Sequence, residues 1–225
     1  MKLLLTLAAV AATAVASAQA PLNPALPDLT GVWQRAEYRP AAKPPLLPEA
    51  AKLYAERKAA RAKGDKTLDP SSACLPEGIP RLMLKAEPFE LLQRPTLVAF
   101  AYQINRLSRV AYLNEPVAKE DGDYYLGEST AKWDGDTLVI DTRGFNDITW
   151  LDDTGLPHGT AMHVTERLQL AKGGQRLVNR ITIEDAENYS APWDLTVNYE
   201  RSKSPRFPED VCAEKIGGSK PRPKK

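Results

Sequence analysis

A short run of this sequence, residues 162–170, contains the residue types best suited to proton transfer. Strand alternation would place Glu166 in a row with four apolar residues, Met162, Val164, Leu168 and Leu170. Burial in such a row favours the protonated form of a carboxylic acid, so Glu166 is a candidate general acid or base. The alternative is a structural glutamate paired with a buried arginine such as Arg180.

The opposite row of this run carries further reactive side chains. His163 and Arg167 share it with Thr165 and Gln169. A histidine at this position could act as a base, and the arginine could stabilise negative charge that develops in a transition state. His158 is the other of the two histidines in the chain. We therefore predict a catalytic group of His163, Glu166, Arg167 and His158.

The segment between residues 145 and 163 is long for a hairpin connection and is rich in aromatic and titratable residues. Phe145 and Trp150 could form the walls of a pocket for a flat or apolar ligand, with a histidine that titrates near neutrality beside them. The alternative is a mobile surface loop whose tryptophan simply covers the sheet.

The run WDGDTLVIDTRGF, residues 133–145, predicts a β-hairpin, because Gly135 accepts the positive φ of a tight turn. With Asp134 and Gly135 as the loop, Glu128 lies directly opposite Asp141. Two facing carboxylates repel each other unless they share a proton, bind a cation or pair with a basic side chain such as Arg143. We therefore count Glu128 and Asp141 as candidate binding residues. The alternative is a solvated outer face.

The sequence argues against a metal site and against a bound cofactor. Two histidines exclude a histidine-rich metal site, and no H-E-x-x-H spacing occurs. A serine-hydrolase elbow, a phosphate loop and a dinucleotide fingerprint are also absent from the sequence. We expect no metal and no cofactor.

A long motif resembles a family of uncharacterised exported bacterial proteins that share the pattern G-x-S-x-x-x-W-x-G-D-T-L-V-x-D-T-x-G-F. The matching residues are Gly127, Ser129, Trp133, Gly135 to Val139, Asp141-Thr142 and Gly144-Phe145. Further matches are Cys74 to Arg81, Trp150, Gly155 to His158, His163 and Glu166-Arg167. The resemblance covers most of the chain after Cys74. It implies that His163, Glu166 and Arg167 belong together, and it supplies no substrate.

The start of the chain predicts an exported protein. Met1-Lys2, an apolar run to Val15 and small residues up to Ala20 are typical of a cleaved signal peptide at residues 1–20. This run is too short to span a bilayer, and we expect no membrane span. The two cysteines, Cys74 and Cys212, should then form a disulfide in an oxidising compartment. The protein should be periplasmic or secreted.

The remaining chain predicts one β-rich domain, residues 21–216, followed by a disordered basic tail, residues 217–225. Short β-branched and aromatic runs recur at regular spacing from Thr96 onward, which indicates a mainly antiparallel barrel or strongly curved sheet. Gly31 and Trp33 resemble the opening strand of lipocalin-like barrels, where the indole closes one end. A helix near the N-terminus should begin at Pro48, and residues 69–95 should be irregular and pinned by the disulfide.

Two classes of function remain open. The first is an exported enzyme that acts on a small organic molecule by cofactor-independent acid–base chemistry, as a lyase, isomerase or hydrolase. The second is a lipocalin-like carrier in which Trp33, Trp150 and Trp193 line an apolar cavity. A weaker third possibility is an envelope protein that uses its edge strands to bind partners. Nearly balanced charge argues against nucleic acid as a partner, and the oligomeric state is left open.

Overall fold

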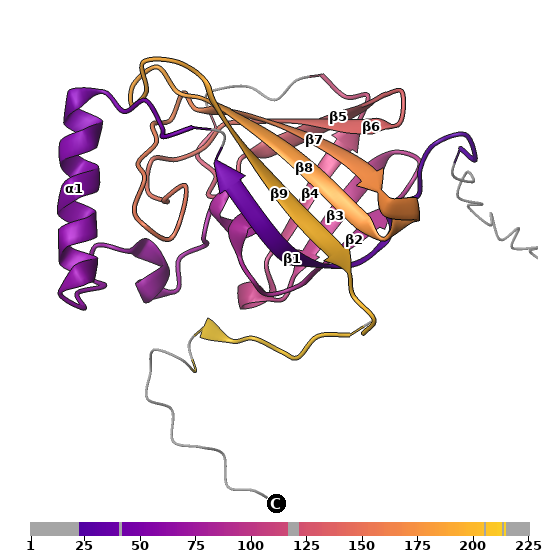
Figure 1. The fold of residues 1–225 in the computed structure, drawn as a ribbon, viewed down its shortest axis with the longest axis horizontal. Helices are drawn as coiled ribbons and strands as arrows, with labels where there is room; N and C mark the ends of the chain where they lie inside the picture. The colour runs from indigo at the N-terminus through magenta and orange to yellow at the C-terminus, as the bar shows by residue number, and fades with distance from the viewer. Residues whose placement is uncertain (1–22, 41, 117–121, 205, 213, 215–225) are drawn as a thin grey trace, which may run out of the picture.

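The computed structural model describes residues 23–40, 42–116, 122–204, 206–212 and 214. The predicted signal peptide and the predicted basic tail lie outside these residues. Within them, the strands form a closed barrel in which β1 pairs with both β2 and β9 (Figure 1). The strands are β1 (Gly31–Pro40), β2 (Phe89–Gln93), β3 (Leu97–Tyr102), β4 (Ser108–Leu113), β5 (Glu128–Asp134), β6 (Thr137–Arg143), β7 (His163–Ala171), β8 (Arg176–Glu184) and β9 (Trp193–Arg201).

The barrel confirms the prediction of a mainly β fold and adds two details. Neighbouring strands are antiparallel except for β4 and β5, which run parallel. The strand β2 lies inside the segment that we expected to be irregular. Pro88 and Pro95 flank this short strand, and their backbone restrictions hide its alternation, in which Phe89, Leu91 and Gln93 are buried.

The interior of the barrel is filled by side chains. Alternation in each strand turns one row inward, as in β3, where Val98, Phe100 and Tyr102 are buried. The rings of Phe89 and Tyr199 meet edge to face, with their centroids 5.0 Å apart. Large side chains therefore occupy the centre, as in other small barrels.

Trp33 lies near the start of β1, at one end of the barrel. The indole is fully buried, and its nitrogen donates a 2.9 Å hydrogen bond to the carbonyl of Leu29. The guanidinium of Arg201, at the end of β9, lies 4.3 Å from the ring centroid. Glycine suits position 31 because its φ is 150° and a Cβ atom there would displace the Arg201 guanidinium.

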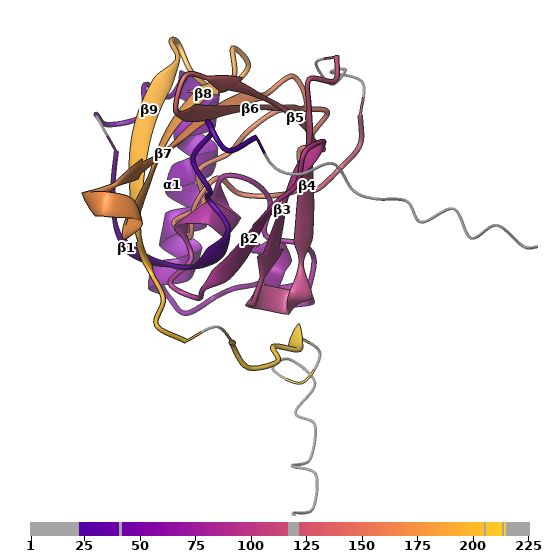
Figure 2. The ribbon, with the colours of Figure 1, turned by 90° about the vertical axis from the view of Figure 1, so that its right-hand side faces the viewer.

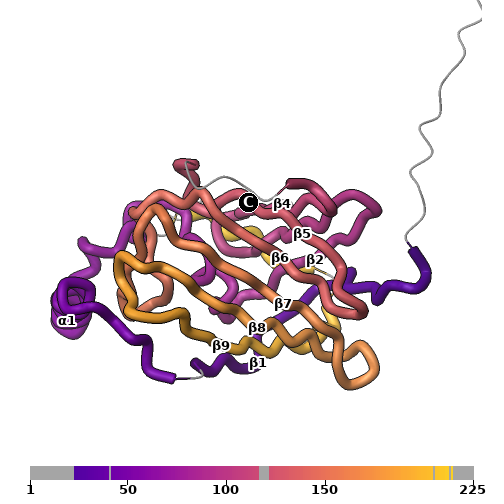
Figure 3. The backbone as a smooth tube through the Cα atoms, turned by 90° about the horizontal axis from the view of Figure 1, so that it is seen from above, coloured from indigo at the N-terminus to yellow at the C-terminus, as the bar shows by residue number. Residues whose placement is uncertain are grey.

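The predicted helix is present as α1 (Pro48–Ala62), which follows β1 and stands beside the other end of the barrel (Figures 1 and 3). Pro48 and Glu49 occupy its first turn, as expected for a helix start. Its barrel-facing stripe follows helical spacing: Ala50, Tyr54, Arg57 and Arg61. Figure 2 looks along the barrel and shows α1 behind the ring of strands.

The irregular segment before β2 is held by a disulfide and an ion pair. Cys74 and Cys212 are bonded, which confirms the prediction from the sequence. Arg81 makes two 2.8 Å hydrogen bonds to the two carboxylate oxygens of Asp69, and both side chains are buried. Single-turn helices complete the fold: η1 (Pro70–Ala73), η2 (Arg81–Leu84), η3 (Ile104–Arg106) and η4 (Lys172–Gly174).

Candidate functional site

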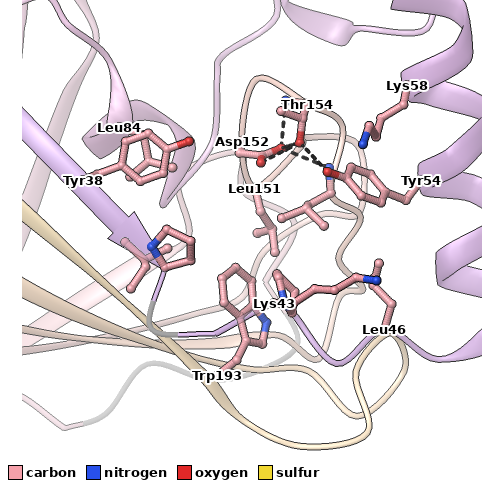
Figure 4. A pocket seen from close by; sticks show the side chains of 14 residues that line it. Tyr38, Lys43, Leu46, Tyr54, Lys58, Leu84, Leu151, Asp152, Thr154 and Trp193 are labelled. Carbon is pink, nitrogen blue, oxygen red and sulfur yellow. Dashed lines mark hydrogen bonds between the residues drawn. The ribbon is translucent and has the colours of Figure 1, made fainter.

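An apolar cavity of about 330 Å³ opens at the α1 end of the barrel (Figure 4). Its inner wall consists of five apolar side chains: Leu84, Leu151, Leu156, Trp193 and Leu195. Its outer wall comes from the end of β1, the strap that follows it and α1, and contains Tyr38, Pro40, Leu46 and Tyr54. We call this cavity the mouth pocket. Its apolar lining and its volume are those of a small-molecule site.

The β6–β7 connection, residues 144–162, closes the barrel beneath this pocket. Trp150 and Leu151 are almost fully buried, so the segment is a plug and not the surface loop that was one of our two expectations. Three guanidinium groups surround the indole of Trp150: those of Arg57, Arg61 and Arg81 lie 5.2, 6.0 and 5.4 Å from its centroid. Two of these arginines belong to α1, so the tryptophan fastens the helix to the plug.

A second set of contacts between α1 and the plug fixes the outer wall of the mouth pocket. The hydroxyl groups of Tyr54 and Thr154 lie 2.8 Å apart, and Arg57 donates a 3.1 Å hydrogen bond to the carbonyl of Gly155. Asp152 shapes the turn between these contacts, because it accepts hydrogen bonds from the backbone N–H groups of Thr154, Gly155 and Leu156. The wall is thus held mainly by polar contacts.

His158 lies within the plug and is buried. Its Nε2 atom lies 2.7 Å from the hydroxyl of Thr149, and its Nδ1 atom lies 3.2 Å from the carbonyl oxygen of Gly159. Burial lowers the pKa of His158, so the neutral form is favoured. Nδ1 must then carry the proton, since a carbonyl only accepts. Both ring nitrogens therefore serve the structure of the plug.

Glu166 points into the barrel, as strand alternation predicts, and forms an ion pair with Arg109 of β4. Arg109 also donates hydrogen bonds to Ser129 and Thr142, at 2.9 and 2.8 Å. The side chain of Asn179 donates a 2.9 Å hydrogen bond to the glutamate. Glu166 is therefore paired with a buried arginine, but the partner is Arg109 and not Arg180, which is exposed on the outer face of β8.

His163 lies on the outer face of the barrel, together with Asp141 and Arg143. Its Nδ1 atom is 3.2 Å from the Arg143 guanidinium, which can only donate, so the neutral ring carries its proton on Nε2. Nε2 then donates to Asp141 at 2.5 Å. Burial favours a higher pKa for Asp141, but the hydrogen bond from His163 and the charge of the nearby Arg143 help to outweigh it, and the pKa is lowered. A shallow hollow beside His163 is lined by Glu184, Tyr189 and Ser190.

The register predicted for the β5–β6 hairpin is wrong by two residues. The two-residue loop is Gly135-Asp136, so Glu128 faces Arg143, and Thr130 faces Asp141. The expected carboxylate pair is therefore absent. Gly135 has a positive φ of 62° and Asp136 does not, which fits a turn with glycine at its first central position.

The structure separates the residues that the sequence grouped as catalytic. His163 and Arg167 point outward, Glu166 points inward, and His158 lies in the plug. Arg167 pairs with Asp134 at 2.7 Å on the surface. No cluster of three or more metal-ligating side chains occurs among the residues that the structure describes.

The predicted binding residues are also dispersed. Trp193 lines the mouth pocket, whereas Trp33 lies at the other end of the barrel. Phe145 and Trp150 are buried within the plug. The four aromatic residues therefore do not line one common cavity.

Tyr38, Tyr54 and the leucines of the pocket walls were not predicted as site residues from the sequence. One signal was present in the sequence. The helical spacing of Tyr54 with Arg57 indicates that α1 turns both side chains toward the same face.

The helix in the described part of the chain is too short and too polar to cross a membrane. No protein-family model matches the chain, and no curated protein matches it. Among solved structures, the REP1-NXSQ fatty acid transporter aligns with 78% of this chain and 97% of its own, at 11% identity and a TM-score of 0.40. The apo form of Caenorhabditis elegans lipid binding protein 8 aligns with 77% of this chain and 95% of its own, at 8% identity and a TM-score of 0.39.

Proposed function

We propose that this protein is a carrier that binds a small apolar molecule in the mouth pocket. The observation that carries this proposal is the pocket itself: an apolar cavity of about 330 Å³, walled by aromatic and aliphatic side chains at one end of a closed barrel. Removal of apolar ligand surface from water in such a cavity supplies the binding free energy. Because side chains fill the barrel interior, the ligand binds at the end of the barrel and not at its centre.

The chemical state of the candidate acid–base groups supports a carrier over an enzyme. The charge of Glu166 is balanced by Arg109, and both nitrogens of His158 are engaged within the plug. An acid–base catalyst must exchange a proton with its substrate, so it needs a lone pair or a proton that is within reach. These two groups offer neither to the mouth pocket.

The second candidate, an acid–base enzyme, has one observation in its favour. The His163–Asp141 pair lies at the edge of a hollow on the outer face of the barrel. Against it, the Nδ1 atom of His163 is occupied by Arg143. We therefore keep the carrier as the main proposal.

The neutral dye N-phenyl-1-naphthylamine tests the carrier. Its fluorescence should rise as it enters the mouth pocket, with saturable binding to one site. Leu46→Glu, which places a charge in the outer wall, should weaken binding at least tenfold, because a buried unpaired carboxylate is strongly unfavourable. Leu53→Glu is the matched control, since Leu53 lies on α1, is partly exposed and does not line the pocket. It should bind the dye as the unaltered protein does.

The same titration distinguishes the carrier from the enzyme, because the two proposals place the ligand at different sites. In protein labelled with nitrogen-15, a dye bound in the mouth pocket leaves the imidazole signals of His163 unchanged. Saturable binding that shifts these signals, and that Leu46→Glu does not weaken, would place the ligand at the outer hollow and overturn the carrier proposal.

We also propose that the protein acts outside the cytoplasm. The disulfide between Cys74 and Cys212 supports this location, because such bonds persist in oxidising compartments. Mass spectrometry of the mature protein from the native cell tests it, through cleavage after Ala18 or Ala20.

A further inference from the structure

Trp193, which lines the mouth pocket, carries a buried hydrogen-bond donor that the described residues leave unpaired. Trp193 is only 7% exposed, and its indole Nε1 has no hydrogen-bond partner among the residues that the structure describes. Figure 4 shows the nitrogen-bearing edge of this ring turned toward the strap that carries Lys43 and Leu46. An unpaired buried donor costs free energy, so a ligand that supplies an acceptor gains by pairing with it.

The charged groups at the rim of the pocket are mainly positive. Lys43 and Lys58 both line it, and neither forms an ion pair within the described ranges of the chain. The Lys58 ammonium lies 5.2 Å from the centroid of the Tyr54 ring, so it stays beside the cavity. These two cations favour a negatively charged ligand.

The carboxylate of Asp152, which also belongs to the lining, does not reverse this preference. Its Oδ1 atom accepts hydrogen bonds from the backbone N–H groups of Thr154, Gly155 and Leu156, and Oδ2 accepts one from the Thr154 hydroxyl. Asp152 Oδ1 is thus fully engaged within the plug. The remaining charged groups of the lining are the two lysines.

We propose that the mouth pocket binds a compact, ring-containing organic anion, whose carboxylate or sulfonate accepts a hydrogen bond from Trp193 Nε1 near Lys43 and Lys58. The rings of Tyr38, Tyr54 and Trp193, together with Pro40 and Pro44, offer flat apolar faces to the ring system. The cavity volume is near the lower limit for small-molecule sites, which suits a compact ligand. This inference rests on the proposed carrier function and adds the class of ligand.

Two dyes with the same ring skeleton distinguish the contribution of the negative charge to binding from that of the apolar rings. N-phenyl-1-naphthylamine is neutral, and 1-anilinonaphthalene-8-sulfonate adds one sulfonate. The unaltered protein should bind the sulfonate roughly tenfold more tightly, because hydrogen bonds to charged groups are the strong ones. The ratio of the two affinities is the measured quantity. Displacement of the sulfonate dye by 2-naphthoate, but not by its methyl ester, should show that a carboxylate is also accepted.

Variants of the pocket residues test which side chains cause the preference for the sulfonate dye. Trp193→Phe keeps a ring but removes the N–H, so it should lower the ratio roughly tenfold. Replacing both rim lysines, Lys43→Met and Lys58→Met together, should lower the ratio and its dependence on salt concentration. Trp133→Phe and Lys52→Met are the matched controls, because neither residue lines the pocket, and both should keep the ratio.

Each outcome decides between the two proposals. If the sulfonate dye binds no more tightly than the neutral dye, the proposal of an anionic ligand is overturned and the carrier proposal is retained. Equal loss of both dyes in Trp193→Phe shows that the ring acts only by packing, which also overturns the anion. Failure of both dyes to bind overturns the carrier and the anion together. A ratio near ten that falls in Trp193→Phe and persists in both controls supports the anion.

Discussion

Arg109 and Glu166 lie against each other in the interior of the barrel, guanidinium to carboxylate, with side chains 1% and 0% exposed. They come from β4 and β7, so the pair joins separate parts of the sheet across the core. Arg109 donates hydrogen bonds to Ser129 and Thr142, and Asn179 donates one to Glu166. A buried charge is tolerated only with such partners, so we expect this arrangement of the strands to depend on both members of the pair.

Loss of one partner of this pair should be costly. Glu166→Gln leaves Arg109 buried without a counterion, and we expect the unfolding free energy to fall by about 3–5 kcal/mol. Urea denaturation at neutral pH measures it, before any ligand is known. Replacement of both residues, Arg109→Met with Glu166→Leu, should cost less than Glu166→Gln alone. A melting temperature of Glu166→Gln close to that of the unaltered protein would contradict the structural role and favour catalysis.

Stability should depend on pH through His158. Burial lowers its pKa below the ordinary value of 6.5, so the unfolded chain binds a proton at a higher pH than the folded protein does. The unfolding free energy should therefore fall as the pH drops below about 6.5, by at most about 1.4 kcal/mol per pH unit, until the folded-state pKa is reached. Chemical denaturation of the unaltered protein and His158→Gln at a series of pH values gives this slope. Parallel curves for the two proteins would contradict it.

The contact between the plug and α1 should determine the shape of the mouth pocket and its affinity for the dye. Gly155 has a φ of 104°, and a Cβ atom there would lie 2.8 Å from the Cβ atom of Arg57. Gly155→Ala should therefore displace α1, lower stability by about 1–3 kcal/mol and weaken dye binding. Gly64→Ala is the control, because Gly64 also has positive φ but a Cβ there would have open space. Equal dye binding by the two variants would show that α1 does not shape the pocket.

The disulfide should contribute substantially to stability. Its cysteines are 138 residues apart in sequence. Closing so long a loop restricts the unfolded chain, and the chain-entropy model gives about 4–5 kcal/mol. Cys74→Ala combined with Cys212→Ala should show this loss in urea denaturation. Intact-mass analysis of the unaltered protein should show no alkylated thiol before reduction. Two alkylated cysteines would mean that the bond is not formed.

The strands could be predicted largely from the sequence because their alternation is local. The inward position of Glu166 and the outward positions of His163 and Arg167 follow from the two-residue period alone. The identity of the partner of Glu166 does not. Alternation turns Arg109 inward and Arg180 outward, but only the closure of the barrel brings Arg109 of β4 against Glu166.

The failures of prediction have similar causes. The predicted register of the hairpin was wrong because Asp134 pairs with Thr137 and is not part of the turn. The position of the turn depends on its geometry, which the alternation of the strands does not show. The mouth pocket could not be predicted, because Tyr38, Tyr54 and Trp193 come from three separate segments that meet only in the folded protein. Patterns within one segment carry no information about such meetings.

The pairing of the first strand with the last has a kinetic consequence. β1 (Gly31–Pro40) bonds to β9 (Trp193–Arg201), so the barrel cannot close until almost the whole domain is available. Contacts between such distant segments are slow to form, because the entropy of loop closure must be overcome first. Until then the side of β1 that pairs with β9 is an open edge, available for pairing with other chains. Folding of this protein should therefore be limited by barrel closure, and the open edge of β1 is where a partly folded chain would aggregate.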